Sequence, residues 1–119
     1  GSVEKPEASL KIEMDGKIMS VKINGNGPVD ATFNAIKKLT LTDFKLKLYQ
    51  VNAITAGTDA QGEVTVRLED KDLTSQAKGS DPDIIVASAK AYINALNRII
   101  FKKTKSIKEN SSNLQIRGV

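Results

Sequence analysis

The segment that decides the fold is Tyr49-Gln50-Val51-Asn52-Ala53-Ile54-Thr55-Ala56-Gly57-Thr58-Asp59-Ala60-Gln61-Gly62, which lies between two similar halves of the chain. Just upstream, Phe44, Leu46 and Leu48 partly alternate with lysines, which predicts a strand over residues 44–54. The segment then continues in small and turn-forming residues, which can line a pocket without filling it. An ordinary strand followed by a loop has the same composition, so the neighbouring sequence has to decide between these interpretations.

The first half is predicted to be a hairpin followed by a helix. Apolar and polar residues alternate on both sides of Asp15-Gly16, and Gly25-Asn26-Gly27 then breaks the second strand. Pro28 suits the first helical position, and Lys37 and Lys38 suit the C-terminal end of the helix dipole. The apolar stripe of this helix consists of Val29, Ala31, Thr32, Ala35, Ile36 and Leu39.

The second half repeats this order. Alternation over residues 64–69, the turn Asp70-Lys71-Asp72 and residues 73–78 predict a second hairpin, which Gly79-Ser80-Asp81 should end. Pro82 is expected to begin a longer helix that forms the main core element. The predicted buried face of this helix consists of Ile84, Ile85, Ser88, Ala91, Tyr92, Ala95, Leu96, Ile99 and Ile100.

A shift of 54 residues superimposes the two halves, so that Gly25 falls on Gly79 and Pro28 on Pro82. The predicted class is therefore α+β: two β-β(-β)-α units related by a pseudo-twofold, about residues 8–39 and 44–101, with mostly antiparallel strands and two helices packed on the sheets. We expect the helices to share one sheet face. Only the second unit has a leading strand, which predicts that the chain has been cut from a longer protein just downstream of the missing one.

Composition argues against an enzyme. At 119 residues the chain is long enough for one small domain. It contains neither cysteine nor histidine, which excludes a Ser-His-Asp triad, a cysteine nucleophile and a typical zinc site. We expect no catalytic residues and no metal site. The N-terminus has no signal-peptide pattern and no apolar run of about 20 residues is present, so we expect a soluble, cytoplasmic protein.

The net charge of +4 is concentrated at the C-terminus. Residues 102–119 hold five basic residues and one acidic residue, and the first 101 residues hold 13 of each. No aromatic residue follows Phe101, whereas binding to single-stranded nucleic acid typically uses stacking aromatics beside a basic face. We predict a basic, mobile tail over residues 102–119, a disordered or vector-derived segment over residues 1–7, and no nucleic-acid or membrane partner.

Asp30 and Asp83 fall in the predicted first turns of the two helices. A helix start carries exposed amides and about half a positive charge, so it attracts a carboxylate. If a nearby acid also received an ammonium group, the pair of helix starts would suit a zwitterionic amino acid. The alternative is that both aspartates only complement the helix dipoles. Gly25-Asn26-Gly27 has no following lysine and is not a phosphate-binding loop.

Three motifs in order carry a family resemblance: Gly25-Asn26-Gly27-Pro28-Val29-Asp30-Ala31, the segment from Tyr49 to Val64, and Asp83-Ile84-Ile85-Val86-Ala87-Ser88-Ala89-Lys90-Ala91-Tyr92-Ile93-Asn94-Ala95-Leu96-Asn97-Arg98. Over residues 8–101 the chain resembles the C-terminal regulatory domain of 2-isopropylmalate synthase and its relative citramalate synthase. The resemblance implies an upstream catalytic barrel, an acyltransferase that uses a divalent metal and acetyl-CoA. This domain would hold no cofactor, form a homodimer, and bind an end-product amino acid that inhibits the barrel.

The resemblance also implies a site at the dimer interface. Its residues would be Gly25, Asn26, Gly27, Val29, Asp30 and Ala31 at the first helix start, Leu46, Tyr49, Ala53 and Ala60 in a central wall, and Pro82, Asp83 and Ile84 at the second helix start. Ala53 leaves room for a branched aliphatic side chain, whose burial supplies about 1.5–3 kcal/mol. Ala53 and the Gly-Asn-Gly-Pro turn favour leucine, with isoleucine as the alternative. A purely structural dimerisation domain, with Tyr49 as a half-buried strand aromatic, is the competing interpretation.

Overall fold

The computed structural model describes residues 7–14, 16–53 and 60–117. Its elements are, in order, β1 (Glu7–Met14), β2 (Lys17–Asn24), α1 (Pro28–Thr40), β3 (Lys45–Ala53), β4 (Gly62–Asp70), β5 (Leu73–Asp81) and α2 (Ile84–Arg117). The α+β class, the antiparallel strands and both hairpins are confirmed. That the two halves are related by a pseudo-twofold stays a prediction.

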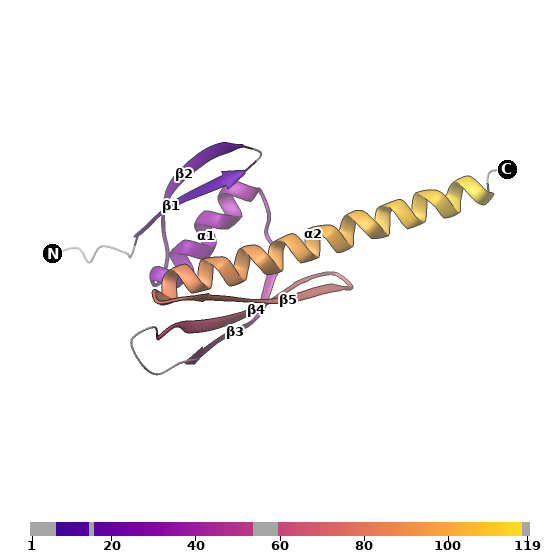
Figure 1. The fold of residues 1–119 in the computed structure, drawn as a ribbon. Helices are drawn as coiled ribbons and strands as arrows, with labels where there is room; N and C mark the ends of the chain where they lie inside the picture. The colour runs from indigo at the N-terminus through magenta and orange to yellow at the C-terminus, as the bar shows by residue number, and fades with distance from the viewer. Residues whose placement is uncertain (1–6, 15, 54–59, 118–119) are drawn as a thin grey trace.

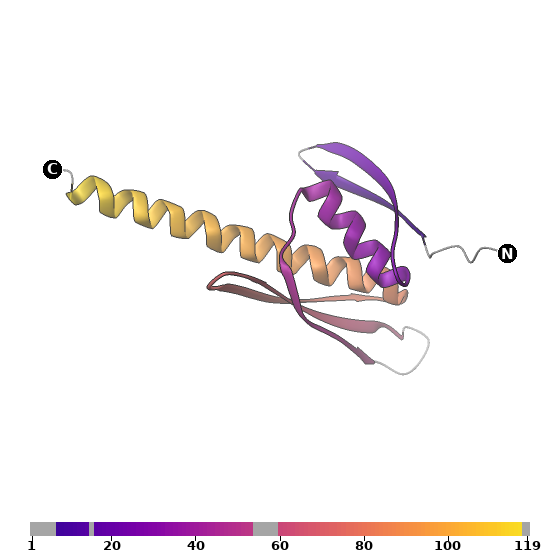
Figure 2. The same ribbon diagram turned by 180° about the vertical axis from the view of Figure 1, so that it is seen from behind.

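The strands form two separate sheets, with both helices between them (Figures 1 and 2). The hairpin β1-β2 packs on α1, the sheet β3-β4-β5 packs on α2, and α1 contacts α2. The prediction of one shared sheet face is therefore wrong. Each helix has a sheet of its own, because β1 and β2 pair only with each other in the described part of the chain.

The core lies between α2 and the inner face of β4. Val64, Val66 and Leu68 are fully buried there, and most of the predicted face of α2 is buried too. Ile85 and Ile100 are exceptions, because 37% and 40% of these residues remain exposed. Phe33 of α1, which the predicted stripe omitted, is buried with its ring centroid 4.6 Å from that of Tyr92. The burial of Phe33 could have been predicted from the sequence, because it lies one helical turn after Val29, on the same face of the helix.

Gly79 was predicted to end the strand that begins at residue 73. This prediction is wrong, because β5 continues to Asp81. A Cβ atom at residue 79 would meet the amide nitrogen of Ala91, the carbonyl oxygen of Ala87 at 2.6 Å and the Cβ of Lys90 at 2.7 Å. The glycine is therefore required by the close approach of α2 to β5. Small residues on the facing side of the helix allow the same approach.

Helix α2 continues to Arg117, well past residue 101, where the second predicted unit ends. The sequence contains no signal that would end the helix earlier, because neither glycine nor proline occurs between Pro82 and Gly118. The basic segment is thus helical through Arg117, and residues 104–110 are all exposed. Its mobility stays a prediction.

By length and composition, residues Ile84–Asn110 of α2 would be sufficient to cross a membrane, with a mean hydropathy of 1.3 over the most apolar window. The same stretch holds Ala91, Ala95 and Ile99, which are buried in the core cluster with β4. The apolar character is explained by this packing, and we interpret α2 as a core helix.

Candidate functional site

The first helix, α1, begins without a side-chain cap on its amides. Gly25 is buried against the backbone of Ala31, and the Ala31 amide donates to the Gly27 carbonyl at 2.9 Å. The carboxylate of Asp30 accepts a hydrogen bond from the Asn26 amide at 2.8 Å. Asp30 therefore stabilises the turn that precedes α1, while its side chain stays at an exposed position.

The second helix begins at Ile84, so the predictions that Pro82 opens it and that Asp83 lies in its first turn are wrong. Asp83 is the residue that caps α2: its carboxylate accepts from the amides of Ile85 at 2.8 Å and Val86 at 3.4 Å. An aspartate in this position satisfies amides that have no partner within the helix.

Asp81 stabilises the same corner from the end of β5. Its carboxylate accepts from Lys90 Nζ at 2.8 Å and from the Asp83 amide at 2.9 Å. The hydrogen bond from Lys90, and then the one from the Asp83 amide, hold the pKa of Asp81 below its usual value. The acid therefore stays ionised beside the start of α2.

The central wall depends on a bulge in β3. Leu46 pairs with Leu68 and Tyr49 pairs with Val66, with a register shift between Leu46 and Leu48. In a regular strand, residues three apart point to opposite faces, but the shift places Leu46 and Tyr49 on the face of the buried β4 residues. The predicted wall residues are thus brought together by an irregularity that the alternation pattern did not reveal.

This inner face of β3 is only partly covered. Val51 pairs with the fully buried Val64, yet 49% of Val51 is exposed, and 42% of Leu46 is exposed. The reason is that β3 is an edge strand, whereas α2 packs over β4 and β5. An apolar surface consequently remains open on the inner side of the sheet.

Tyr49 joins this surface to the start of α2. Its hydroxyl lies 2.7 Å from Ser88 Oγ, and Ser88 donates its single proton to the Ile84 carbonyl at 2.7 Å. Tyr49 must therefore donate to Ser88. The ring of Tyr49 also meets Phe33 of α1 edge-on, with centroids 5.7 Å apart. The role of Ser88 as a polar link was missed, because the sequence placed it only on a buried face.

The far end of β3 also reaches the second helix start. Ala53 pairs with Gly62, and a Cβ atom on Gly62 would meet Cδ1 of Ile84, so Ile84 lies over the end of β4. The side chain of Ala53 and residues 54–59 lie outside the described residues. Ala60 is exposed.

Of the predicted residues, Ala53 lies at the end of the domain where both helices begin (Figures 1 and 2), whereas Leu46 lies near the opposite end of β3. The central wall and the second helix start are linked through Tyr49 and Ser88, and the first helix start approaches them through Phe33. Among the described residues, no group of three or more acidic side chains could hold a metal ion. The chemistry available is an apolar surface beside polar helix starts.

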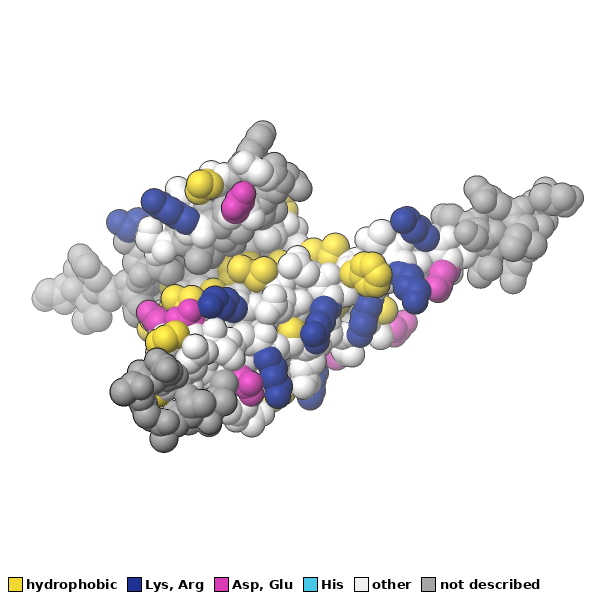
Figure 3. All heavy atoms as spheres, in the orientation of Figure 1, with side chains coloured by type: hydrophobic (Ala, Val, Ile, Leu, Met, Phe, Trp, Pro, Cys, Tyr) yellow, Lys and Arg dark blue, Asp and Glu magenta, His cyan; other side chains and the backbone are white. Residues whose placement is uncertain are grey.

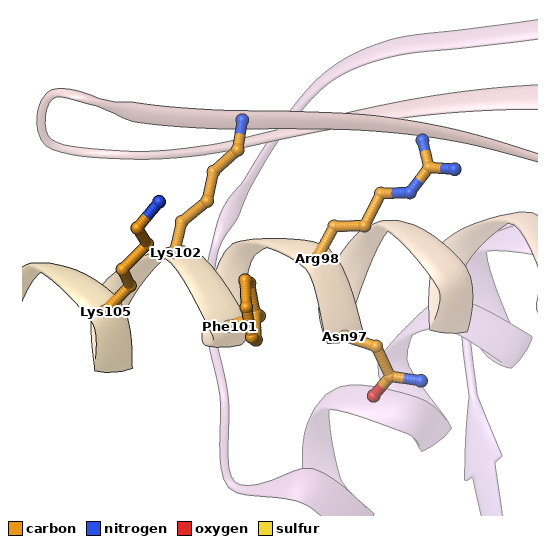
Figure 4. Close-up of a pocket in the computed structure, with 5 residues that line it drawn as sticks. All are labelled: Asn97, Arg98, Phe101, Lys102 and Lys105. Atoms are coloured by element: carbon orange, nitrogen blue, oxygen red, sulfur yellow. The ribbon is translucent and has the colours of Figure 1, made fainter.

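A separate hollow of about 450 Å³ lies on α2, away from these residues (Figure 4). Its lining consists of Asn97, Arg98, Phe101, Lys102 and Lys105. Arg98 and Lys102 point to β5, where they donate to the carbonyls of Gln76 and Thr74. None of the predicted site residues lines this hollow.

Comparison with known proteins shows which family model matches the chain. The model of the LeuA allosteric (dimerisation) domain matches residues 1–100. The 2-isopropylmalate synthase of Rhodopseudomonas palustris (strain TIE-1) is 50% identical over 111 residues, which is 93% of this chain and 21% of the relative. That of Afipia carboxidovorans is 55% identical over 98 residues, 82% of this chain and 19% of the relative. The chain thus spans about a fifth of the length of these relatives.

Proposed function

The chain belongs to the LeuA allosteric (dimerisation) domain family, as the sequence motifs suggested, and on this premise we propose that it is the regulatory domain of a 2-isopropylmalate synthase. In this proposal, leucine binds where two copies of the domain meet and inhibits a catalytic barrel elsewhere in the same protein. That barrel would use a divalent metal and acetyl-CoA, and the whole protein would work in the cytoplasm. The observation that carries the proposal is the family match over residues 1–100.

The geometry supports an amino-acid effector at the end where both helices begin. The exposed inner face of β3, with Leu46 and Val51, offers apolar surface to an aliphatic side chain, whose burial is worth about 1.5–3 kcal/mol. The start of α1 has no side-chain cap and so favours a carboxylate, and Asp30 is exposed and acidic, as an ammonium partner requires. The remaining proposed residues are Gly25, Asn26, Gly27, Val29, Ala31, Tyr49, Ala53, Ala60, Pro82, Asp83 and Ile84.

The hydrogen bonds from Tyr49 to Ser88 and from Ser88 to Ile84 suggest how binding would be transmitted. A ligand on β3 that moved Tyr49 would disturb the first turn of α2, and α2 is the longest element of the domain. Leucine would then inhibit by favouring one arrangement of the dimer over another.

Calorimetric titration of the purified chain with leucine, isoleucine and valine tests the proposal. We expect leucine to bind most tightly. Tighter binding of isoleucine would instead assign the chain to a citramalate-type regulator. Absence of heat and of any thermal shift with all three amino acids would contradict the proposal and favour a purely structural dimerisation domain.

Two substitutions test the site. Ala53→Phe should abolish leucine binding by filling the space for its side chain, whereas Gln50→Phe, an exposed position of the same strand paired with Thr65, should not. Asp30→Asn should weaken binding if the carboxylate receives the ammonium group, with the turn residue Asp72→Asn as control. A change in stability alone would show that Asp30 only supports the helix start.

A further inference from the structure

The turn before α1 contains two Asn-Gly pairs in succession, Asn24-Gly25 and Asn26-Gly27. In any protein, the amide nitrogen of the residue that follows an asparagine can attack the asparagine side chain and close a succinimide ring. Glycine permits this attack best, because it has no Cβ atom beside the attacking nitrogen and rotates freely. Every other asparagine of the chain is followed by a residue that has a side chain. The turn is therefore where the sequence makes ring closure easiest.

The pair Asn26-Gly27 is open to this reaction. Asn26 is exposed, and its side-chain amide has no hydrogen-bond partner among the described residues. Gly27 is extended, with φ −165°, and an added Cβ atom would have nothing within 4 Å. The Gly27 carbonyl accepts from the Ala31 amide at 2.9 Å, but the Gly27 amide makes no hydrogen bond within the described part of the chain. Neither reacting group is thus engaged elsewhere.

The pair Asn24-Gly25 has the same composition but is held by its surroundings. The backbone of Asn24 pairs with Glu7 at the end of the β1-β2 hairpin. Gly25 is buried, and a Cβ atom on it would meet the backbone of Asp30 at 2.9 Å and that of Ala31. Ring closure requires rotation of the main chain beside the attacking nitrogen, and the contact with α1 opposes this rotation unless the turn opens locally. The two pairs, equivalent in sequence, therefore differ in the folded chain.

We propose that Asn26 is a site of spontaneous deamidation in the folded protein. The Gly27 amide nitrogen attacks Cγ of Asn26 and forms a C–N bond. The bond from Cγ to the side-chain nitrogen breaks, and that nitrogen leaves as ammonia with the proton of the Gly27 amide. Water then opens the succinimide: cleavage between Cγ and the ring nitrogen gives aspartate, and cleavage at the main-chain carbonyl gives isoaspartate. The overall change consumes a water molecule, releases ammonia and needs no other reactant.

Both products alter the start of α1. The Asn26 amide donates to the Asp30 carboxylate at 2.8 Å, directly before helix amides that have no side-chain cap. Aspartate at residue 26 adds a carboxylate near that of Asp30, and acidic side chains already lie at the start of α2, on the same end of the domain (Figures 1 and 3). Isoaspartate also lengthens the main chain of the turn, because the chain then runs through the former side chain. Deamidation thus changes the charge and the shape of this helix start.

Ageing of the purified chain, followed by tryptic digestion and tandem mass spectrometry, tests the proposal. The peptide between Lys22 and Lys37 contains both pairs, and its fragment ions report each asparagine separately. In native buffer, Asn26 should lose its amide at least about fivefold faster than Asn24, because only Gly25 is packed against α1. In concentrated urea, the two rates should agree within about threefold, because this packing is lost.

The same measurement can overturn the inference. Equal rates in native buffer would mean that the packing of Gly25 protects nothing. A native rate at Asn26 more than about tenfold below its rate in urea would mean that the folded turn holds Asn26 as well.

Gly27→Ala tests the attacking group. The added methyl group fits the open space and the extended backbone, so circular dichroism should show an unchanged fold. Deamidation at Asn26 should slow about tenfold or more, because the methyl group crowds the attacking nitrogen. The rate at Asn24 in the same molecule is the control and should change less than about twofold. An unchanged rate at Asn26 would overturn ring closure through Gly27.

The consequence for ligand binding rests on the proposed function, whereas the deamidation does not. Ageing should weaken leucine binding at least about threefold, because the new charge repels a carboxylate at the start of α1. The loss should be smaller in Gly27→Ala, with each protein compared with its own fresh sample. Loss of the Asn26 amide in a chain that binds no branched-chain amino acid would contradict the proposed function alone. Leucine binding by an aged chain that retains the Asn26 amide would overturn the deamidation alone.

Discussion

Replacing Tyr92 by phenylalanine should stabilise the domain, and the gain should increase with pH. The ring of Tyr92 is fully buried against Phe33, but its hydroxyl has no hydrogen-bond partner among the described residues. Burying a hydroxyl without a partner costs about 1–3 kcal/mol. Phenylalanine keeps the ring and removes this cost, so Tyr92→Phe should raise the free energy of unfolding at pH 7 by about 0.5–2 kcal/mol.

The pH dependence follows from the pKa of the same hydroxyl. Burial, with a smaller contribution from the charge of Asp43, raises the pKa of Tyr92 from 10.0 to about 12. Between these values the unfolded chain loses the phenolic proton while the folded chain keeps it, so stability falls as pH rises. The loss amounts to about 1.4 kcal/mol at pH 11 and about 2.7 kcal/mol well above pH 12.

Urea denaturation at pH 7, 9 and 11, followed by circular dichroism at one protein concentration, measures both effects. The advantage of Tyr92→Phe over the parent should grow by about 1.4 kcal/mol between pH 7 and pH 11, because the other titrating groups are common to both proteins and cancel. A variant less stable than the parent at pH 7 would mean that the hydroxyl has a partner. If the difference in unfolding free energy between the two proteins stays constant with pH, burial does not raise the pKa of Tyr92.

Three further substitutions test single features of the fold by denaturation. Leu41→Gly should raise the free energy of unfolding by about 0.5–1 kcal/mol, because this exposed residue ends α1 in the left-handed region at φ 54°. Gly79→Ala should lower it by about 1–3 kcal/mol through the clash with α2, and Gly27→Ala, with nothing within 4 Å of the added atom, should cost less. In a double-mutant cycle, Tyr49→Phe and Ser88→Ala should show a coupling free energy of about 0.5–1.5 kcal/mol. If the two substitutions lower the free energy of unfolding additively, the hydrogen bond between these side chains contributes no stability.

The sequence was a reliable guide to elements whose signals are local. Alternation predicted the strands around Asp15-Gly16 and Lys71-Asp72, and helical periodicity predicted both helices. The buried face of α2 was mostly correct, apart from Ile85 and Ile100 at its edge. The three motifs were sufficient to identify the family.

The candidate site was harder to predict because its residues depend on packing. Leu46 and Tyr49 share a face only through the bulge between Leu46 and Leu48, and a period of two places them on opposite faces. Ser88 was identified as a core residue, but its position opposite Tyr49 depends on how α2 lies across the sheet. Asp83 was expected as the second residue of the helix, since proline was taken as its start, whereas it lies one position before the helix and caps it.

By itself, the sequence determined the order of the elements, the antiparallel class, the family and the lack of histidine and cysteine chemistry, because each follows from residue type and spacing along the chain. Only the tertiary structure decided that the strands form two sheets, that Gly79 lies under a helix rather than at a strand end, and that the inner face of β3 stays open. These features depend on distances between elements far apart in sequence, which local patterns do not encode.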